Sequence, residues 1–128
     1  MSDDCVLIVE DDHHLARAWS LRLKAAGLRT QVAPDAYHAR RLARSEPFRV
    51  IVLDLKIPAG DGFQLHEELL DLQPDPFEVI YVTGSDCPDL ADRASKLGAH
   101  SVFRKPLDMD AFLAAVHECV ATGKRAAV

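Results

Sequence analysis

The chain has 128 residues, of which 48% are hydrophobic and 27% charged, a balance typical of one globular domain with a buried core. Its formal net charge of −5 argues against direct binding to nucleic acid, because phosphate backbones bind basic surfaces. The N-terminus lacks the basic flank and long apolar run of a signal peptide, and no apolar run approaches the ~18 residues that span a bilayer. We therefore expect a cytoplasmic protein with no membrane or nucleic-acid contact.

Five apolar runs predict strands, and a helix-like stretch follows each of them. The strands are expected at residues 5–9, 28–33, 50–53, 79–82 and 101–103, and the helices at 13–26, 35–44, 62–72, 87–97 and 108–121. In the first helix Leu15, Trp19 and Leu23 recur at i,i+4 steps and predict a buried face, and Gly27 follows as the terminating residue. We expect residues 1–128 to form one domain, with an ordered core over about 4–122 and a loose tail at 123–128.

Strands that alternate with long helical stretches pair in parallel through right-handed crossovers, with helices on both faces of the sheet. The run Val50-Ile51-Val52-Leu53 is apolar throughout, as expected for a strand buried on both faces. The predicted fold class is therefore α/β, a doubly wound five-stranded parallel sheet. In open sheets of this kind, a site forms at the carboxyl ends of the strands.

Acidic, hydroxyl and basic side chains stand where four of the expected strands end. Glu10, Asp11 and Asp12 follow the first strand, Asp54 ends the third, Thr83-Gly84-Ser85 follows the fourth, and Lys105-Pro106 follows the fifth. Carboxylates brought together without a cation repel one another and resist ionisation, so such a cluster favours a hard divalent metal ion. Each motif alone has a structural explanation, as a helix cap, a turn or a solvated charge. Their coincidence at one sheet edge indicates a functional site.

The cysteines and histidines do not suggest a second site. Cys5, Cys87 and Cys119 are an odd number without a C-x-x-C pair, so we expect reduced thiols rather than a disulfide framework or a zinc site. His13 and His14 are adjacent and would not share a helix face, which argues against a metal pair.

The motifs at the strand ends resemble the receiver domain of bacterial two-component response regulators, the CheY-like family, over nearly the whole chain. They are Val9-Glu10-Asp11-Asp12, Leu53-Asp54-Leu55-Lys56-Ile57-Pro58-Ala59-Gly60-Asp61-Gly62, Val82-Thr83-Gly84 and Phe103-Arg104-Lys105-Pro106. Each motif is weak alone, but the four in this order are specific. The resemblance implies the flavodoxin-like (βα)5 receiver fold.

The resemblance also implies a phosphorylation site built around magnesium. It makes Asp54 the phosphorylated residue, and it assigns Mg²⁺ to Glu10, Asp11, Asp54 and the backbone carbonyl of Lys56, directly or through water. Mg²⁺ takes oxygen ligands and usually keeps several waters, which suits this set. Asp12 would be a bystander, as the N-cap of the first helix.

Thr83 and Lys105 complete the site that the resemblance implies. The Lys105 ammonium and Mg²⁺ would take two phosphoryl oxygens, and the Thr83 hydroxyl with the Gly84 N–H would take the third. Phosphoryl transfer needs alignment and charge neutralisation more than covalent work by the protein, which agrees with these residue types. Pro106 corresponds to the family's cis proline, which turns Lys105 into the pocket.

The implied function is that of a signalling switch rather than an enzyme. Asp54 would receive a phosphoryl group from a sensor histidine kinase or a histidine phosphotransfer protein, which would shift an equilibrium between inactive and active forms. The first helix and the loops around Asp54 would meet the donor, and the fourth helix, fifth strand and fifth helix would meet the output partner. That partner would be a downstream protein or an output domain missing from the chain, and dimerisation through this face is a further option.

One position departs from the family pattern. Receivers usually carry Tyr or Phe three residues before the lysine, and this chain has Val102 there. Phe103 would point to the opposite side of the strand and could not replace that residue. We therefore hypothesise that output depends on backbone movement of the loop after Thr83 and of the helix after Cys87.

Two other functions would use a similar set of residues or a similar fold. A phosphatase of the haloacid dehalogenase type also gathers Asp, Thr and Lys around Mg²⁺, but it needs an acid two residues after its nucleophile, where this chain has Lys56. A flavodoxin-like cofactor-binding module would need a Ser, Thr or Gly phosphate loop after the first strand. Glu10-Asp11-Asp12 would repel a phosphate at that place.

Overall fold

The computed structural model describes residues 4–58, 60–84 and 89–126 of the chain. Strands and helices alternate along it, beginning with a strand. Their bounds are β1 (Cys5–Val9), α1 (His13–Ala25), β2 (Arg29–Ala33), α2 (Ala36–Ser45), β3 (Val50–Asp54), α3 (Gly62–Leu72), β4 (Glu78–Thr83), α4 (Leu90–Leu97), β5 (Ser101–Arg104) and α5 (Met109–Ala126). In this part of the chain, no helix has the length and apolar character needed to cross a membrane.

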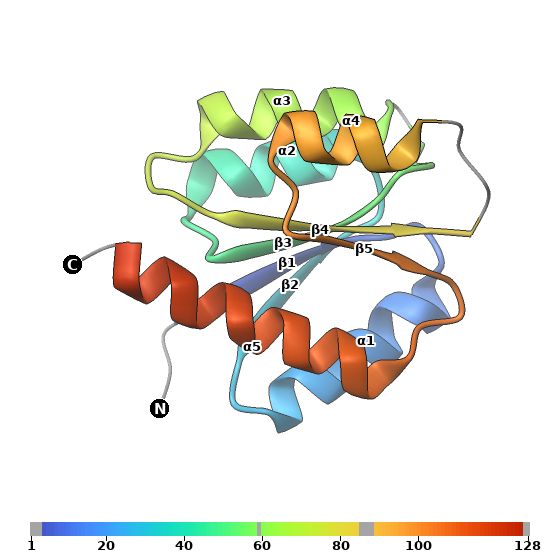
Figure 1. Ribbon diagram of the computed structural model, residues 1–128, viewed down its shortest axis with the longest axis vertical. Coiled ribbons are helices and arrows are strands. Elements are labelled where there is room, and N and C mark those ends of the chain that lie inside the picture. The colour runs from blue at the N-terminus through green and yellow to red at the C-terminus, as the bar shows by residue number, and fades with distance from the viewer. Residues whose placement is uncertain (1–3, 59, 85–88, 127–128) are drawn as a thin grey trace.

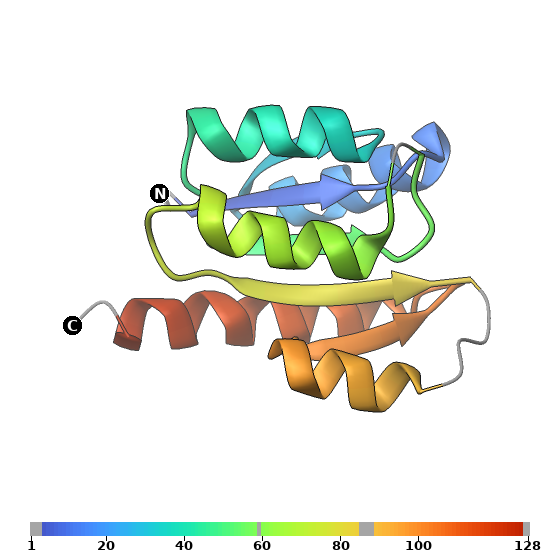
Figure 2. The ribbon, with the colours of Figure 1, turned by 90° about the horizontal axis from the view of Figure 1, so that it is seen from above.

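The five strands form one parallel sheet in the order β2-β1-β3-β4-β5. In Figure 1, α2, α3 and α4 lie on one face of the sheet, and α1 and α5 lie on the other. Figure 2 shows β1, β4 and β5 pointing in the same direction, so the loops that follow the strands gather at one edge. The predicted doubly wound α/β class with its flavodoxin-like order is confirmed.

The central strands are buried on both faces because their alternate residues pack into two different cores. Along β1, Leu7 and Val9 pack with residues of α2, α3 and α4, whereas Val6 and Ile8 pack with residues of α1 and α5. None of these four side chains is exposed to solvent. Trp19, which the sequence places on the buried face of α1, is 3% exposed and belongs to the second core.

Capping side chains set where the first three helices begin. Asp12, Asp35 and Asp61 occupy the N-cap positions, and their carboxylates accept hydrogen bonds from backbone N–H groups at the start of each helix. The Asp12 Oδ1 atom accepts from His14 N at 2.9 Å and from Leu15 N at 3.2 Å. The N-cap expected at Asp12 is therefore confirmed.

Two helix ends differ from the sequence prediction by more than one residue, while the other helix and strand bounds differ by one residue at most. α4 begins at Leu90 rather than at residue 87: residues 85–88 lie outside the described part, and Asp89 has a φ of 62°, which a helical residue does not adopt. α5 continues to Ala126, past the expected end at residue 121 and through residues 123–126 of the tail that was expected to be loose. Gly123 costs a helix only about 1 kcal/mol relative to alanine, and the lysine and arginine after it favour helix.

The start of α3 is packed tightly against the end of β3. A Cβ atom on Gly62 would lie 2.7 Å from the Leu55 Cα and 2.9 Å from the Asp54 carbonyl oxygen, and both of these are backbone atoms. Glycine at this position therefore allows the close approach of helix and strand. This approach positions the loop that follows Asp54.

Candidate functional site

Two buried carboxylates meet at the carboxyl edge of the sheet. Glu10 directly follows β1, and Asp54 is the last residue of β3, which pairs with β1 in parallel. The two residues are 1% and 4% exposed, whereas the neighbouring Asp11 is exposed. The fold thus brings together the acidic residues that the sequence places at two separate strand ends.

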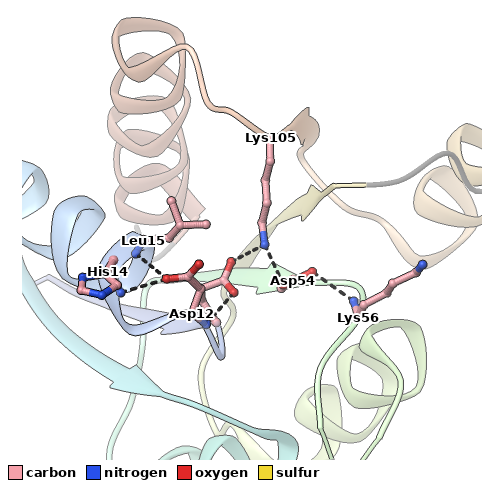
Figure 3. A network of polar contacts seen from close by, with 7 residues as sticks. Asp12, His14, Leu15, Asp54, Lys56 and Lys105 are labelled. Atoms are coloured by element: carbon pink, nitrogen blue, oxygen red, sulfur yellow. Dashed lines mark hydrogen bonds and ion pairs between the residues drawn. The ribbon is translucent and has the colours of Figure 1, made fainter.

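Lys105, which follows β5, reaches across this edge to both carboxylates (Figure 3). Its Nζ donates a hydrogen bond to Asp54 Oδ2 at 2.9 Å and forms an ion pair with Glu10 Oε1. The Lys105 side chain is 21% exposed, so its ammonium group is half-buried beside the carboxylates. One cation is therefore shared by two buried carboxylates.

Backbone N–H groups bind the other carboxylate oxygens. Lys56 N donates to Asp54 Oδ1 at 3.0 Å, and Asp12 N donates to Glu10 Oε2 at 3.0 Å. Asp54 and Glu10 are each bound by an amide on one oxygen and by the Lys105 ammonium on the other, which fixes their orientation. The Lys56 side chain is exposed and points away from Asp54 in Figure 3, so its charge does not pair with this carboxylate.

The charges at this edge do not balance. Burial raises the pKa of Glu10, and the negative charge of Asp54 raises it further, while Lys105 and the Asp12 amide act in the opposite direction. Burial alone would lower the pKa of Lys105, but its contacts with Glu10 and Asp54 outweigh this effect and raise it. Lys105 is therefore protonated at neutral pH, and its single positive charge stands among three carboxyl groups, those of Glu10, Asp11 and Asp54.

The carboxylates offer a donor set that fits a hard divalent cation. Oxygen atoms of Glu10, Asp11 and Asp54 all lie within 4.8 Å of one another. Mg²⁺ and Ca²⁺ take oxygen ligands and offset the repulsion between neighbouring carboxylates. The Lys56 N–H on Asp54 places the Lys56 backbone beside this cluster, and a role for the Lys56 carbonyl stays a prediction. Asp12 is engaged in capping α1 instead.

Thr83 ends β4 next to the acidic cluster. Asp54 and Val82 are register partners in β3 and β4, and Thr83 is 2% exposed. The Lys105 N–H donates to the Thr83 carbonyl at 2.9 Å, which joins the loop after β5 to the end of β4. A Cβ on Gly84 would lie 3.7 Å from Lys105 Cδ, so Gly84 borders the lysine as well. The hydroxyl and the cation expected from the sequence therefore stand at the same edge as the carboxylates.

The end of β5 matches two expectations. The peptide bond between Lys105 and Pro106 is cis, as the resemblance implies. Val102 packs in the core that lies under α3 and α4, whereas Phe103 packs toward α5, with its ring centroid 5.9 Å from that of Phe112. Phe103 thus points away from the face of Val102 and does not replace an aromatic residue there.

One polar pair near the site was not predicted from the sequence. Tyr81 lies two residues before Thr83, and its hydroxyl is 2.6 Å from Nδ1 of His66 in α3. The two residues are 0% and 2% exposed. The periodicity contained a hint, because both polar residues occupy positions that the pattern buries. The partnership itself could not be read, since it joins two elements that are distant in sequence.

An open cavity of about 490 Å³ adjoins the acidic cluster on the side of the loop after β3. Its lining includes Asp11, Lys56, Pro58 and Asp61. The cavity leaves a path by which another molecule can approach the carboxyl edge of the sheet.

A doubly wound sheet with buried carboxylates, a lysine and a threonine at its carboxyl edge defines the class of signal-receiving α/β domains. A family model described as the response regulator receiver domain matches residues 6–117. The chain belongs to this family, and it is a receiver domain of the two-component response regulators, a signalling domain rather than a classical enzyme. This membership sets aside the phosphatase and cofactor-module interpretations.

Individual relatives agree with this family. The chain is 34% identical over 119 residues to the C4-dicarboxylate transport transcriptional regulatory protein DctD of Pseudomonas aeruginosa, covering 90% of this chain and 25% of the relative. The chain therefore spans about a quarter of the length of this curated relative.

Solved structures share the fold. A CheY-like response regulator receiver domain protein from Methanospirillum hungatei has a TM-score of 0.89 at 24% identity, with 97% of this chain and 98% of that chain covered. A response regulator protein from Burkholderia pseudomallei, crystallised with a phosphorylated aspartic acid, a calcium ion and citrate, has a TM-score of 0.81 at 28% identity, with 98% and 74% covered.

Proposed function

We propose that the chain is a phospho-accepting switch whose Asp54 receives a phosphoryl group from a sensor histidine kinase or a histidine phosphotransfer protein, with Mg²⁺ as cofactor. The observation that carries this proposal is the convergence of Glu10, Asp11 and Asp54 with the Lys105 ammonium among them. The phosphorylated aspartic acid and the calcium ion in the Burkholderia relative support both a covalent site and a divalent cation.

In the proposed reaction, a carboxylate oxygen of Asp54 attacks the phosphorus atom of the donor's phosphohistidine. An O–P bond forms, the P–N bond breaks, and its electron pair returns to the imidazole nitrogen of the donor. The Lys56 N–H on Asp54 Oδ1 holds the carboxylate in a fixed orientation for the attack. Lys105, which donates to Asp54 Oδ2, would then donate to an oxygen of the bound phosphoryl group.

Glu10, Asp11, Asp54 and the Lys56 carbonyl would hold Mg²⁺, which neutralises charge on carboxylate and phosphoryl oxygens when bound. The Thr83 hydroxyl, at the end of β4, would donate to a further phosphoryl oxygen together with the Gly84 N–H. These contacts exist only with the phosphoryl group in place, so they favour the active conformation over the inactive one.

The donor would dock on α1 and on the loops around Asp54. A groove of about 380 Å³ between α1 and β2 has Leu21 and Val32 in its lining, which are 55% and 39% exposed. Arg17 and Lys24 lie in the same lining. Residues 13–34 contain four arginine or lysine residues and no aspartate or glutamate, although the whole chain is acidic. A donor helix with an apolar centre and acidic flanks would complement this surface.

The output would pass through α4, β5 and α5 to a downstream protein or to an output domain, and residues 1–128 would act as one receiver domain. The DctD relative is about four times as long as its matching segment and is named a transcriptional regulatory protein, which supports an output of that general kind. Dimerisation through the same face would be one way to transmit the change.

The proposal is tested by incubating the protein with acetyl phosphate and Mg²⁺ and weighing the intact chain. We expect one phosphoryl adduct that is stable in acid and labile in base, because an acyl phosphate has this reactivity. The adduct should be absent without Mg²⁺ and in Asp54→Asn. The control Asp61→Asn changes an exposed carboxylate on the loop after β3 and should keep the adduct.

The outcomes separate the rival functions. A wild-type protein that gains no adduct with Mg²⁺ contradicts the proposal, sustained turnover of phosphomonoesters would indicate a phosphatase, and a yellow protein would indicate a flavin module. Donor docking has its own test: Arg17→Glu with Lys24→Glu should slow phosphorylation by a phosphohistidine protein while leaving the rate with acetyl phosphate unchanged.

A further inference from the structure

A buried hydrogen bond joins the sheet to α3 close to the phosphorylation site. The partners are the Tyr81 hydroxyl of β4 and His66 Nδ1 of α3, which lie 2.6 Å apart and are shielded from water. Burial lowers the pKa of His66, so the imidazole is neutral and the pair carries no charge. A buried polar pair of this kind is directional, and it fixes the position of α3 on β4 more narrowly than aliphatic packing would.

Tyr81 shares its strand and its face with Thr83. The two residues are separated by one position in β4, so their side chains point to the same side of the sheet. The register partner of Tyr81 on β5 is Val102, and both pack in the core under α3 and α4. Tyr81 therefore supplies an aromatic ring directly beside the small residue at 102.

Aromatic and cation–π contacts connect Tyr81 to α4. The rings of Tyr81 and Phe63 meet edge to face, with centroids 5.4 Å apart at an angle of 89°. The Arg93 guanidinium of α4 lies 3.8 Å from the centroid of the same Phe63 ring. Both contacts depend on orientation, so a shift of Tyr81 alters the surroundings of Phe63 and Arg93.

α4 is the helix that a change at the carboxyl edge can shift most readily. It has eight residues, and Ala94 is its one buried residue, whereas α1, α2 and α3 each bury three or more. Its N-cap residue, Asp89, makes no side-chain cap hydrogen bond. A short helix held by few buried contacts shifts or frays at a low free-energy cost.

We infer that Tyr81 and His66 are positioning residues that transmit the phosphorylation state of Asp54 to α3 and α4. This inference rests on the proposed function. When the Thr83 hydroxyl turns to a phosphoryl oxygen, the packing around Tyr81 on the same face of β4 changes. The His66 bond directs that change toward α3, and the Phe63 ring and Arg93 pass it to α4. The aromatic residue of the switch thus stands on β4 in this chain instead of on β5.

The test compares amide spectra of the ¹⁵N-labelled protein with Mg²⁺ alone and with Mg²⁺ plus beryllofluoride, a non-hydrolysed stand-in for the phosphoryl group. In the wild type, the amides of Lys56 and of residues 90–97 should both shift. In Tyr81→Phe, which keeps the ring and removes the hydroxyl, the shifts at 90–97 should fall by about half or more while the Lys56 shift remains. His66→Leu should behave like Tyr81→Phe, and His66→Gln, which can still hydrogen-bond, should retain more of the response.

Ser20→Ala is the matched control. Ser20 Oγ lies 2.6 Å from Thr30 Oγ1 on the α1 side of the sheet, so this variant also loses a short hydrogen bond but should keep the full response at 90–97. Wild-type shifts at 90–97 in Tyr81→Phe, or no shifts there in the wild type, would overturn the inference. A wild type that responds at neither Lys56 nor α4 would instead contradict the proposed function.

Discussion

At the amino edge of the sheet, the buried Asp4 carboxylate faces the Arg49 guanidinium, with Oδ1 3.3 Å from Nε. At the carboxyl edge, Glu10 and Asp54 share the single ammonium group of Lys105. A carboxylate with its own guanidinium partner needs no further cation, whereas two carboxylates on one cation gain from a second one. The difference separates an amino edge that an ion pair stabilises from a carboxyl edge whose charges favour a bound cation.

Gln73 completes the amino edge without any charge. Its Oε1 accepts from Phe48 N at 2.7 Å, and its Nε2 donates to the carbonyls of Ala43 at 2.7 Å and Glu46 at 2.9 Å. The Ala43 carbonyl would meet the N–H of residue 47 in a continuing helix, but Pro47 has none. The Gln73 amide therefore replaces a backbone hydrogen bond that the sequence cannot form.

The largest effect is expected at the amino edge, for Gln73→Ala. This variant leaves one N–H and two carbonyls without their partner, which should lower the free energy of unfolding by about 3 kcal/mol. Urea unfolding measures the loss, and phosphoryl uptake at Asp54 in the folded variant should be unchanged. Gln64→Ala, at an exposed position of α3, should change stability by less than about 0.5 kcal/mol. If Gln73→Ala leaves the free energy of unfolding unchanged, the structural role that we give to the amino edge is contradicted.

Lys105→Met tests the balance at the carboxyl edge. Glu10 and Asp54 lose the cation that they share, so we expect a loss of about 2 kcal/mol in unfolding free energy at neutral pH without Mg²⁺. Thermal unfolding should also show a larger stabilisation by Mg²⁺ than in the wild type. Lys56→Met removes an exposed lysine and should show neither effect. Equal losses in the two variants would contradict the role given to Lys105.

Mg²⁺ should stabilise the wild type through this same edge. At about ten times its dissociation constant, a ligand of the native state adds about 1.4 kcal/mol, or about 5 °C in melting temperature. Asp11→Ala removes an exposed carboxylate that we propose as a ligand, and it should abolish most of this dependence while leaving the metal-free stability nearly unchanged. An equal melting temperature with and without Mg²⁺ would show that the carboxyl edge needs no further cation.

Between the edges, His66 should make stability depend on pH. Because burial lowers its pKa from 6.5, the unfolded chain binds a proton that the folded chain excludes. The stabilising contribution is present above about pH 6.5 and is lost as the pH falls toward the lower folded pKa. Urea midpoints at about pH 7.5 and about pH 5.5 should therefore differ less in His66→Gln than in the wild type. His117→Gln, at an exposed position of α5, should keep the wild-type difference.

The smallest effect concerns the thiols. Burial raises the pKa of Cys5, with the charge of Glu46 acting in the same direction, and burial raises the pKa of Cys119 to about 12. In a Cys87→Ser background, iodoacetamide at mildly alkaline pH should leave the native protein unmodified and should alkylate both thiols after unfolding. Mass spectrometry measures this difference, and rapid native alkylation of Cys5 would show that the amino edge is open to solvent.

Local sequence patterns were sufficient to predict the helices, the strands and the residues of the acidic site. The apolar runs predicted all five strands within one residue, and the polar residues that follow them, from Glu10 to Lys105, lie at one edge because parallel strands end together. The start of α4 was placed too early, since helical periodicity does not reveal the left-handed backbone of Asp89. α5 extends beyond the predicted end because one glycine, Gly123, does not stop a helix whose following residues favour it.

Partnerships between distant residues could not be predicted. Neither the sharing of Lys105 by two carboxylates nor the pair of His66 with Tyr81 leaves a trace in local spacing. Gln73 is the same case, because its three partners lie more than twenty residues away in the chain. Such contacts arise from tertiary packing and become visible only when the elements are assembled.

Glycine at position 62 limits the substitutions that the chain can accept there. Since a methyl group there would meet backbone atoms at 2.7 Å and 2.9 Å, even the smallest replacement would push the loop after Asp54 away from its helix. In a saturation library selected for signalling, Gly62 should therefore tolerate as little change as Asp54 itself, although it contributes no functional group. A position can be invariant because of the space it leaves empty.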